Sequence, residues 1–176
     1  MVRQISIVAF LKRFRRRTGG ATAVELAIVA LPFFTLLFAI LELAMVFVGT
    51  TVLDNSLINA ARQIRTGQAQ TASMTQAQFR QTICDGIAPL LSCDERLVID
   101  VRRFNSFGGV TTPPPLDEDG NFAGGDAFEP GAAGDIIVAR AFYAWPLMSP
   151  TSFVFANMNG DAHMISTATA FRNEPF

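Results

Sequence analysis

The sequence predicts an α+β fold in which a long N-terminal transmembrane α-helix packs on a small antiparallel β-sheet domain with a second short helix. Three observations support this prediction. Residues 21–48 of the 176-residue chain form an apolar stretch of membrane-spanning length, a helical pattern of apolar residues continues through 49–66, and three alternating segments follow within 67–176. The length allows one membrane segment and one small domain.

Charge is divided between the two ends of the chain. Six basic and no acidic residues precede Thr18, whereas from Gly67 onward six arginines stand against twelve acidic residues. Basic residues beside an apolar span mark its cytoplasmic side. We therefore expect residues 1–20 to be a basic cytoplasmic leader and the acidic domain to lie outside the cytoplasm. The residues expected to set this orientation are Lys12, Arg13, Arg15, Arg16 and Arg17.

The same basic leader could be interpreted as an arm that binds nucleic acid. It directly adjoins a membrane-length apolar run, however, so we expect membrane lipid as a partner and no nucleic acid. A cleaved secretory signal is a further alternative, but the apolar run is much longer than the roughly 7 to 15 residues of such a signal.

Two acidic residues, Glu25 and Glu42, flank sixteen uncharged residues from Leu26 to Leu41. As a helix these sixteen would be about 24 Å long, which is shorter than the hydrocarbon core of about 30 Å. At least one carboxylate must therefore lie at the edge of the hydrocarbon or inside it, where a charge usually has a partner or a function. Glu25 is the better candidate because the positive end of the helix dipole favours a carboxylate there. We expect Glu42 near the outer interface.

At Gly20-Ala21-Thr22-Ala23-Val24-Glu25 the sequence resembles the processing site of type IV pilin-like proteins, and the string from Gly19 to Pro32 resembles the TadE-like family of Tad (Flp) pilus assembly proteins. The resemblance implies a pilin-like fold and a structural, non-enzymatic role as a pseudopilin, or minor pilin, of a Tad-type pilus assembly and secretion system. Leu26 follows Glu25 where Flp-type major pilins have tyrosine, and the C-terminal part is far longer, which favours a minor pilin.

The resemblance also implies the roles of individual residues. A prepilin peptidase would cut between Gly20 and Ala21, leaving Glu25 as the fifth residue of the mature chain. In related pilins this glutamate meets the N-terminal amine of a neighbouring subunit, so Glu25 is expected to set helix registration during assembly.

The partners that the resemblance implies are the prepilin peptidase, other minor pilins, the major Flp-type pilin and the inner-membrane assembly platform. It implies a bacterial inner-membrane location with the C-terminal domain in the periplasm, and incorporation in the pilus at the cell surface. The alternative is an uncleaved single-pass anchor that carries an extracytoplasmic binding module.

Beyond the span, apolar residues recur at steps of three and four from Leu53 to Ile64, so the same helix is expected to continue to Thr66 and to stop at Gly67. Residues 68–73 are polar and small and are predicted to be a linker. A second helix should follow, capped by Ser73 or Thr75.

Residues 97–104, 135–145 and 163–172 alternate between apolar and polar side chains and are predicted strands. Between the first two strands, residues 105–134 contain eleven Gly and Pro in thirty positions. We expect a flexible, exposed loop there that contacts other subunits.

Cys84 and Cys93 are the only cysteines. In an oxidising compartment they are expected to form a disulfide, worth roughly 2.5 to 3 kcal/mol for so short a loop on the chain-entropy model. Two buried free thiols are the alternative. Only His163 is available to join them in a zinc site, which has too few ligands.

Two further patterns could be taken for functional sites. Asp161 and His163 would share a face of a strand, but no nucleophile motif accompanies them. Residues 117–121 resemble the start of a calcium loop, yet Phe122 and Phe128 occupy the positions that require Gly and Glu. We therefore expect no enzymatic activity, no cofactor and no metal.

Overall fold

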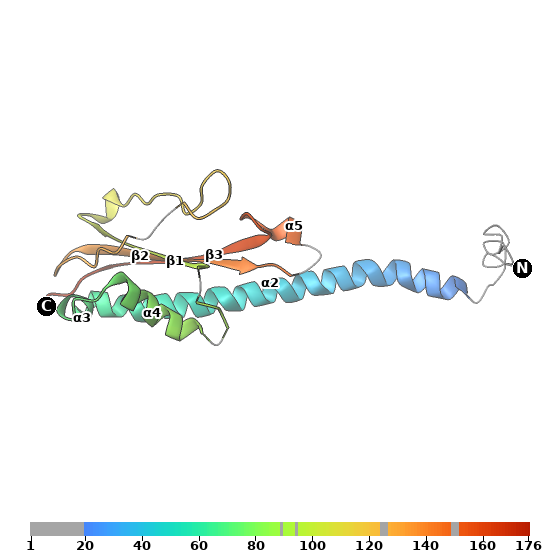
Figure 1. Cartoon of the computed structure of the whole chain (residues 1–176), viewed down its shortest axis with the longest axis horizontal. Coiled ribbons are helices and arrows are strands. Elements are labelled where there is room, and N and C mark those ends of the chain that lie inside the picture. Colours follow the sequence, from blue (N-terminus) through green and yellow to red (C-terminus); the bar gives the residue numbers. More distant parts are fainter. Residues whose placement is uncertain (1–19, 89, 94, 124–126, 149–151) are drawn as a thin grey trace, which may run out of the picture. The chain divides into compact units, whose positions relative to one another are not determined.

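The computed structural model describes residues 20–88, 90–93, 95–123, 127–148 and 152–176. The basic residues Lys12 to Arg17 lie outside the described residues. The elements follow in the order α2 (Ala21–Arg65), α3 (Gln68–Thr71), α4 (Gln76–Ile87), β1 (Leu97–Phe104), η2 (Phe107–Gly109), β2 (Ile136–Pro146), α5 (Ser152–Phe155) and β3 (Ala162–Arg172), as Figure 1 shows. The chain divides into two compact units, Met1–Leu41 and Glu42–Phe176. The predicted α+β class is confirmed.

The three strands form one antiparallel sheet with the order β1-β2-β3. Leu97 pairs with Tyr143 at one end of the β1–β2 ladder, and β2 pairs with β3 from Ile136 opposite Arg172 to Pro146 opposite Ala162. Each predicted strand is found within one residue of its expected ends, because β-branched and aromatic residues, which favour strands, recur along all three segments.

One face of the sheet packs with α2 and α4 around a single core. The side chains of this core come from every second position of β1 and β2 and from the apolar stripes of the two helices. From the strands it includes Leu97, Ile99, Val101, Ile137, Ala139, Ala141 and Tyr143, and from the helices Leu53, Leu57, Ala60, Ile64, Phe79, Ile83 and Ile87. The stripe predicted for residues 49–66 is thus a core surface, which follows from its helical period.

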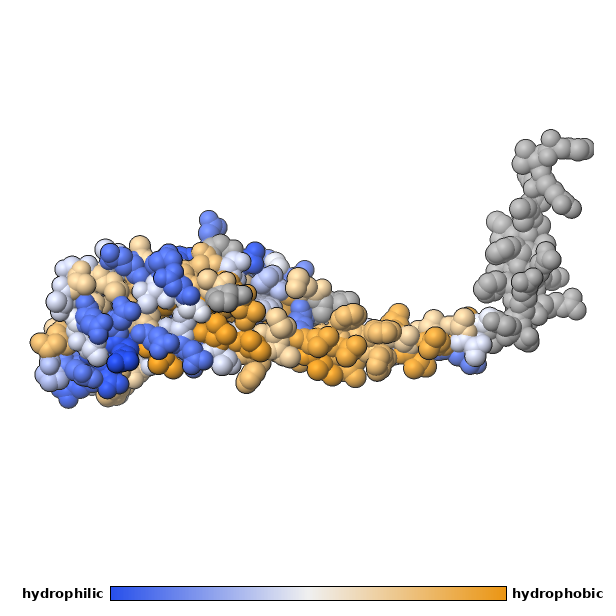
Figure 2. Space-filling view, turned by 90° about the horizontal axis from the view of Figure 1, so that it is seen from below, coloured by the Kyte–Doolittle hydropathy of each residue, from blue (hydrophilic) through white to orange (hydrophobic). Residues whose placement is uncertain are grey.

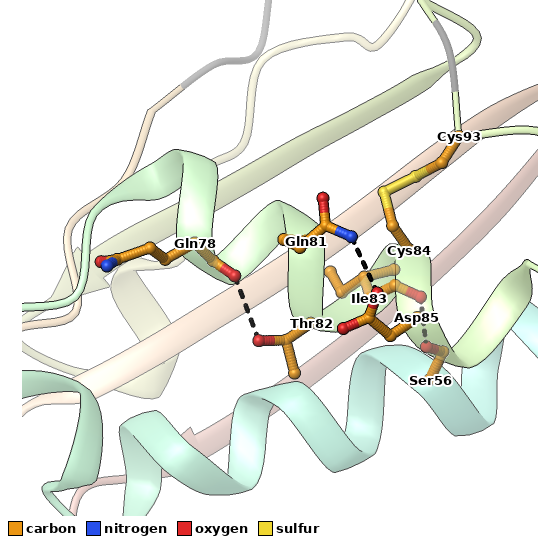
Figure 3. Close-up of a disulfide and its surroundings, with 8 residues drawn as sticks. All are labelled: Ser56, Gln78, Gln81, Thr82, Ile83, Cys84, Asp85 and Cys93. Carbon is orange, nitrogen blue, oxygen red and sulfur yellow. Dashed lines mark hydrogen bonds between the residues drawn. A yellow bond between two sulfur atoms is a disulfide. The ribbon is translucent and has the colours of Figure 1, made fainter.

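The two helices approach each other closely beside this core. The hydroxyl of Ser56 on α2 donates a hydrogen bond of 2.8 Å to the carbonyl of Ile83 on α4, as Figure 3 shows. A Cβ at Gly86 would lie 2.2 Å from the Ser56 hydroxyl oxygen, so glycine at this position permits the contact. On the other side of α2, Asp54 accepts a hydrogen bond from the Thr167 hydroxyl on β3.

α4 begins with a capping box. Thr75 is the N-cap, and its hydroxyl accepts from the Gln78 backbone N–H at 3.3 Å, while the Gln78 side chain accepts from the Thr75 backbone N–H at 2.8 Å. The pair satisfies two N–H groups that the first turn would otherwise leave unpaired. Of the two predicted caps, Thr75 is the one that the structure uses.

The junction after α2 differs from the sequence prediction. Gly67 adopts a left-handed conformation with φ of 79° and ends α2, as expected. Residues Gln68–Thr71, however, form the one-turn helix α3 instead of an irregular linker. The turn is held by tertiary contacts that composition does not reveal: Ala69 is buried in the core, and the Gln70 amide donates to the Pro130 carbonyl at 2.8 Å.

The described parts of the 105–134 loop contact the sheet. Val101 on β1 donates its N–H to the Ala127 carbonyl at 2.8 Å and accepts from the Glu129 N–H at 2.9 Å. Between these two bonds, the Phe128 ring lies 5.3 Å from the ring of Phe79 on α4. The loop therefore extends the edge of the sheet at β1. Its predicted flexibility and its role in subunit contacts stay predictions.

The other face of the sheet carries a buried ion pair. Asp100 on β1 lies directly opposite Arg140 on β2, and its side chain is only 1% exposed. Asp100 accepts from Arg140 Nε at 3.0 Å and from Arg102 Nε at 2.8 Å. Arg140 also donates to the Pro113 carbonyl at 3.0 Å, so the loop reaches over this face. Both charges are satisfied within the domain, as buried charges must be.

Candidate assembly surface on the N-terminal helix

α2 begins at the predicted cleavage junction. Gly20 immediately precedes the helix, and Ala21 is its first residue. A Cβ built on Gly20 would meet no heavy atom within 4 Å in the described part of the chain. The backbone at this junction is therefore not packed against the described residues.

Glu25 lies one turn into α2 and is exposed. No hydrogen bond or ion pair joins its carboxylate to another residue that the structure describes. Its neighbours along the helix, Val24 and Leu26, are 52% and 69% exposed. Among the described residues, the carboxylate therefore lies on an apolar surface without a partner, and such a charge is costly once water is removed.

The apolar surface continues along α2 as far as Val48. Sixteen large apolar side chains between Val24 and Val48 are exposed, and Figure 2 shows the orange surface that they form. They are Val24, Leu26, Ile28, Val29, Leu31, Phe33, Phe34, Leu36, Leu37, Phe38, Ile40, Leu41, Leu43, Met45, Phe47 and Val48. By length and composition, the helix is long and apolar enough to cross a membrane. Helices that are apolar all round are covered by lipid or by other helices.

Glu42 has a partner that the sequence did not reveal. Its side chain is half-buried, and its Oε1 accepts a hydrogen bond of 2.7 Å from the backbone N–H of Met148, just after β2. The two residues are 106 positions apart, so no local pattern could indicate the contact. The carboxylate fixes the start of the β2–β3 connection to α2.

The predicted disulfide is present between Cys84 and Cys93, with a Cα–Cα distance of 5.5 Å (Figure 3). It joins the last turn of α4 to the segment that leads into β1. The alternative of two free thiols is thereby excluded. The bridge lies in the domain and takes no part in the apolar surface of α2.

The two other patterns that could be taken for sites serve local structure. Nδ1 of His163 lies 2.9 Å from the Phe155 carbonyl. Oδ1 of Asp117 accepts from the backbone N–H groups of Asp119 and Asn121, at 3.0 and 2.8 Å, and so caps its own turn. Among the residues that the structure describes, no group of three or more His, Cys, Asp or Glu side chains could hold a metal ion.

Comparison with known proteins gives one result. The model of the TadE-like protein family matches residues 20–62. No curated protein and no solved structure matches the chain. The matched residues begin at the predicted cleavage junction, include Glu25 and the apolar surface, and extend into the part of α2 that packs in the core. The match covers Gly20 to Arg62 and agrees with the resemblance to the TadE-like family that the sequence predicted.

Proposed function

We propose that this protein is a structural minor pilin, or pseudopilin, of a Tad-type pilus assembly and secretion system. The observation that carries the proposal is that the segment that matches the TadE-like family bears the sixteen exposed apolar side chains of α2. Such a surface is stable in lipid before assembly and among the apolar helices of other pilins afterwards.

The charge distribution supports an orientation in the inner membrane. The basic leader stays in the cytoplasm, and the domain with its acidic excess lies in the periplasm or on the assembled pilus. The Cys84–Cys93 disulfide supports this location, since such bonds persist outside the cytoplasm.

The proposed partner of Glu25 is an amine from another subunit. Cleavage after Gly20 would leave a positive charge on Ala21, at the helix end where the dipole already disfavours a cation. A carboxylate from the adjacent helix offsets both effects. Because an unpaired Glu25 is costly in an apolar bundle, the pairing favours one neighbour and one axial register. The neighbouring helices would belong to other minor pilins and to the major Flp-type pilin, brought together by the inner-membrane assembly platform.

Processing by a prepilin peptidase is the first prediction. Co-expression of the full chain with the Tad prepilin peptidase should yield a membrane-extracted protein that lacks residues 1–20 and begins at Ala21, as measured by intact-mass spectrometry. The matched control is Gly20→Val, which should stay uncut because the branched side chain alters the junction. An intact Met1 in the wild-type protein, with active peptidase present, would instead favour the uncleaved anchor with an extracytoplasmic binding module.

The second prediction concerns Glu25→Ala. Cleavage should proceed as in the wild type, while incorporation into the pilus or its base complex should fall at least about ten-fold, because the amine of the neighbour loses its carboxylate. Quantitative immunoblots of sheared pili and of purified base complexes measure this. Glu25→Asp, which keeps the charge, should retain more incorporation than alanine. Normal incorporation of Glu25→Ala would mean that the carboxylate does not register the helix.

A further inference from the structure

The apolar surface of α2 does not end at Glu42. Leu43, Met45, Phe47 and Val48 follow it and are 47%, 46%, 73% and 45% exposed. Within the Glu42–Phe176 unit, this short stretch is therefore an exposed apolar surface at the start of the unit. An exposed patch of this kind marks a contact with lipid or protein.

Glu42 does not interrupt this surface as a free charge would. Its carboxylate is half-buried and accepts the Met148 N–H at 2.7 Å, and hydrogen bonding of this kind lowers the cost of removing a charge from water. Counted from Leu26 to Val48, the helix has 23 residues and a length of about 35 Å, which suffices for a hydrocarbon core of about 30 Å. The sixteen residues that end at Leu41 do not suffice. The outer edge of the hydrocarbon is thus expected near Val48.

The hydrogen bond between Met148 and Glu42 holds the start of the β2–β3 connection beside the part of α2 that bears this apolar surface. Met148 is 89% exposed and Val154, on α5, is 61% exposed. No charged residue occurs from Ala141 to Gly160, although the chain from Gly67 onward carries twelve acidic residues. Segments that face lipid lack charged residues because a charge is costly in hydrocarbon, whereas an exposed periplasmic loop can carry charges at no such cost.

The only tryptophan lies where this connection leaves the sheet. The Trp145 ring packs on α2, since a Cβ at Gly49 would lie 2.9 Å from it. Gly49 directly follows Val48, the residue at which the apolar surface of α2 ends. Tryptophan is enriched at the boundary between headgroups and hydrocarbon. Its position agrees with the boundary deduced from the length of the helix.

From these observations we infer that Met148, just after β2, and Val154, on α5, form a second membrane contact at the boundary between headgroups and acyl chains on the periplasmic side. The inference rests on α2 spanning the membrane, which the proposed function also requires. The contact is apolar, so it should form on zwitterionic lipid and depend little on salt, unlike the contact of a basic patch with anionic lipid. It would fix the rotation of the domain against the bilayer until the subunit leaves for the pilus.

The test uses the full chain in phosphatidylcholine vesicles. Met148→Cys and Val154→Cys are labelled with an environment-sensitive NBD fluorophore, and the labels are exposed to phospholipids that carry a doxyl quencher at a shallow or a deep acyl position. The native cysteines are joined in a disulfide, so the introduced thiol is the reactive one. Leu36→Cys in the span and Ala170→Cys on β3 are the controls, and all four positions are exposed.

The expected result is quenching of the labels at 148 and 154 at least about two-fold stronger by the shallow quencher than by the deep one, at both low and high salt. The label at 36 should be quenched by the deep lipid and the label at 170 by neither. Labels at 148 and 154 that behave like the one at 170, while that at 36 is quenched, would overturn the inference and leave the span intact. Absence of quenching at 36 would remove the span itself and the proposed function with it. Labels at 148 and 154 that are shielded only in assembled pili would assign the surface to a protein neighbour, against the inference.

Discussion

Replacing Asp100 with alanine is expected to lower the free energy of unfolding by about 3 to 5 kcal/mol. The Asp100 side chain is 1% exposed and accepts hydrogen bonds from Arg140 and Arg102. Its removal leaves the Arg140 guanidinium, only 10% exposed, buried without a carboxylate. Urea unfolding of the full chain in detergent micelles, followed by the fluorescence of Trp145, measures the change.

Two variants serve as controls for Asp100→Ala. Glu174→Ala removes an ion pair with Arg65 in which the Glu174 and Arg65 side chains are 48% and 56% exposed. This substitution should lower the free energy of unfolding by less than about 1 kcal/mol. Asp100→Leu combined with Arg140→Met removes both charges and should recover most of the stability, because no unpaired charge then remains. An Asp100→Ala loss no larger than that of Glu174→Ala would show that the buried pair does not stabilise the outer face of the sheet.

Phe79→Ala is expected to lower the free energy of unfolding by a similar amount, about 3 to 5 kcal/mol. Phe79 is fully buried, and its ring contacts Phe128 with the ring centroids 5.3 Å apart. The substitution leaves a cavity in the core. It also removes the ring on which Phe128 packs, and the residues on either side of Phe128 bond to Val101. Hydrogen exchange at the Val101 and Glu129 amides should therefore speed up more than exchange at the amides of the β2–β3 ladder.

Phe107→Ala is the control, because Phe107 is also a phenylalanine but lies in the 105–134 loop and is 59% exposed. This substitution should change the free energy of unfolding by no more than about 0.5 kcal/mol. Equal effects of the two substitutions would mean that Phe79 does not anchor the loop to the domain.

The elements that the sequence predicted well are those whose signals are local. Thr75 and Gln78 stand at the spacing of a capping box, and α4 begins there. β1 was predicted with the bounds that the structure has, because it is rich in β-branched residues and alternates between apolar and polar side chains from Ile99 to Arg102. The end of α2 was predicted from Gly67, because the left-handed backbone conformation that ends the helix depends on this one residue.

The features that the sequence did not predict depend on distant residues. The burial of Asp100 is one such feature: the 105–134 loop reaches over its face of the sheet, and Arg140 pairs with it from 40 residues away. The contact of Glu42 with Met148 and the one-turn helix α3 have the same origin, since each is held by a partner far along the chain.

The candidate site was predicted from the resemblance together with the unusual position of a carboxylate. Gly20, Ala21 and Glu25 all lie in the segment that matches the TadE-like family. The partner proposed for Glu25 belongs to another copy or another pilin, so neither one sequence nor one chain contains the pair. Cleavage and registration therefore stay predictions for the two experiments on Gly20 and Glu25.

The return of β3 alongside α2 sets a condition on how the domain folds. Thr167 bonds to Asp54 across 113 residues, and Glu174 pairs with Arg65 across 109. Contacts this distant are slow to form, because a long loop must close first. The sheet layer can close on α2 only after nearly the whole chain has been synthesised. The Cys84–Cys93 bridge spans only nine residues and can form well before that, so it can order α4 while the domain is still open.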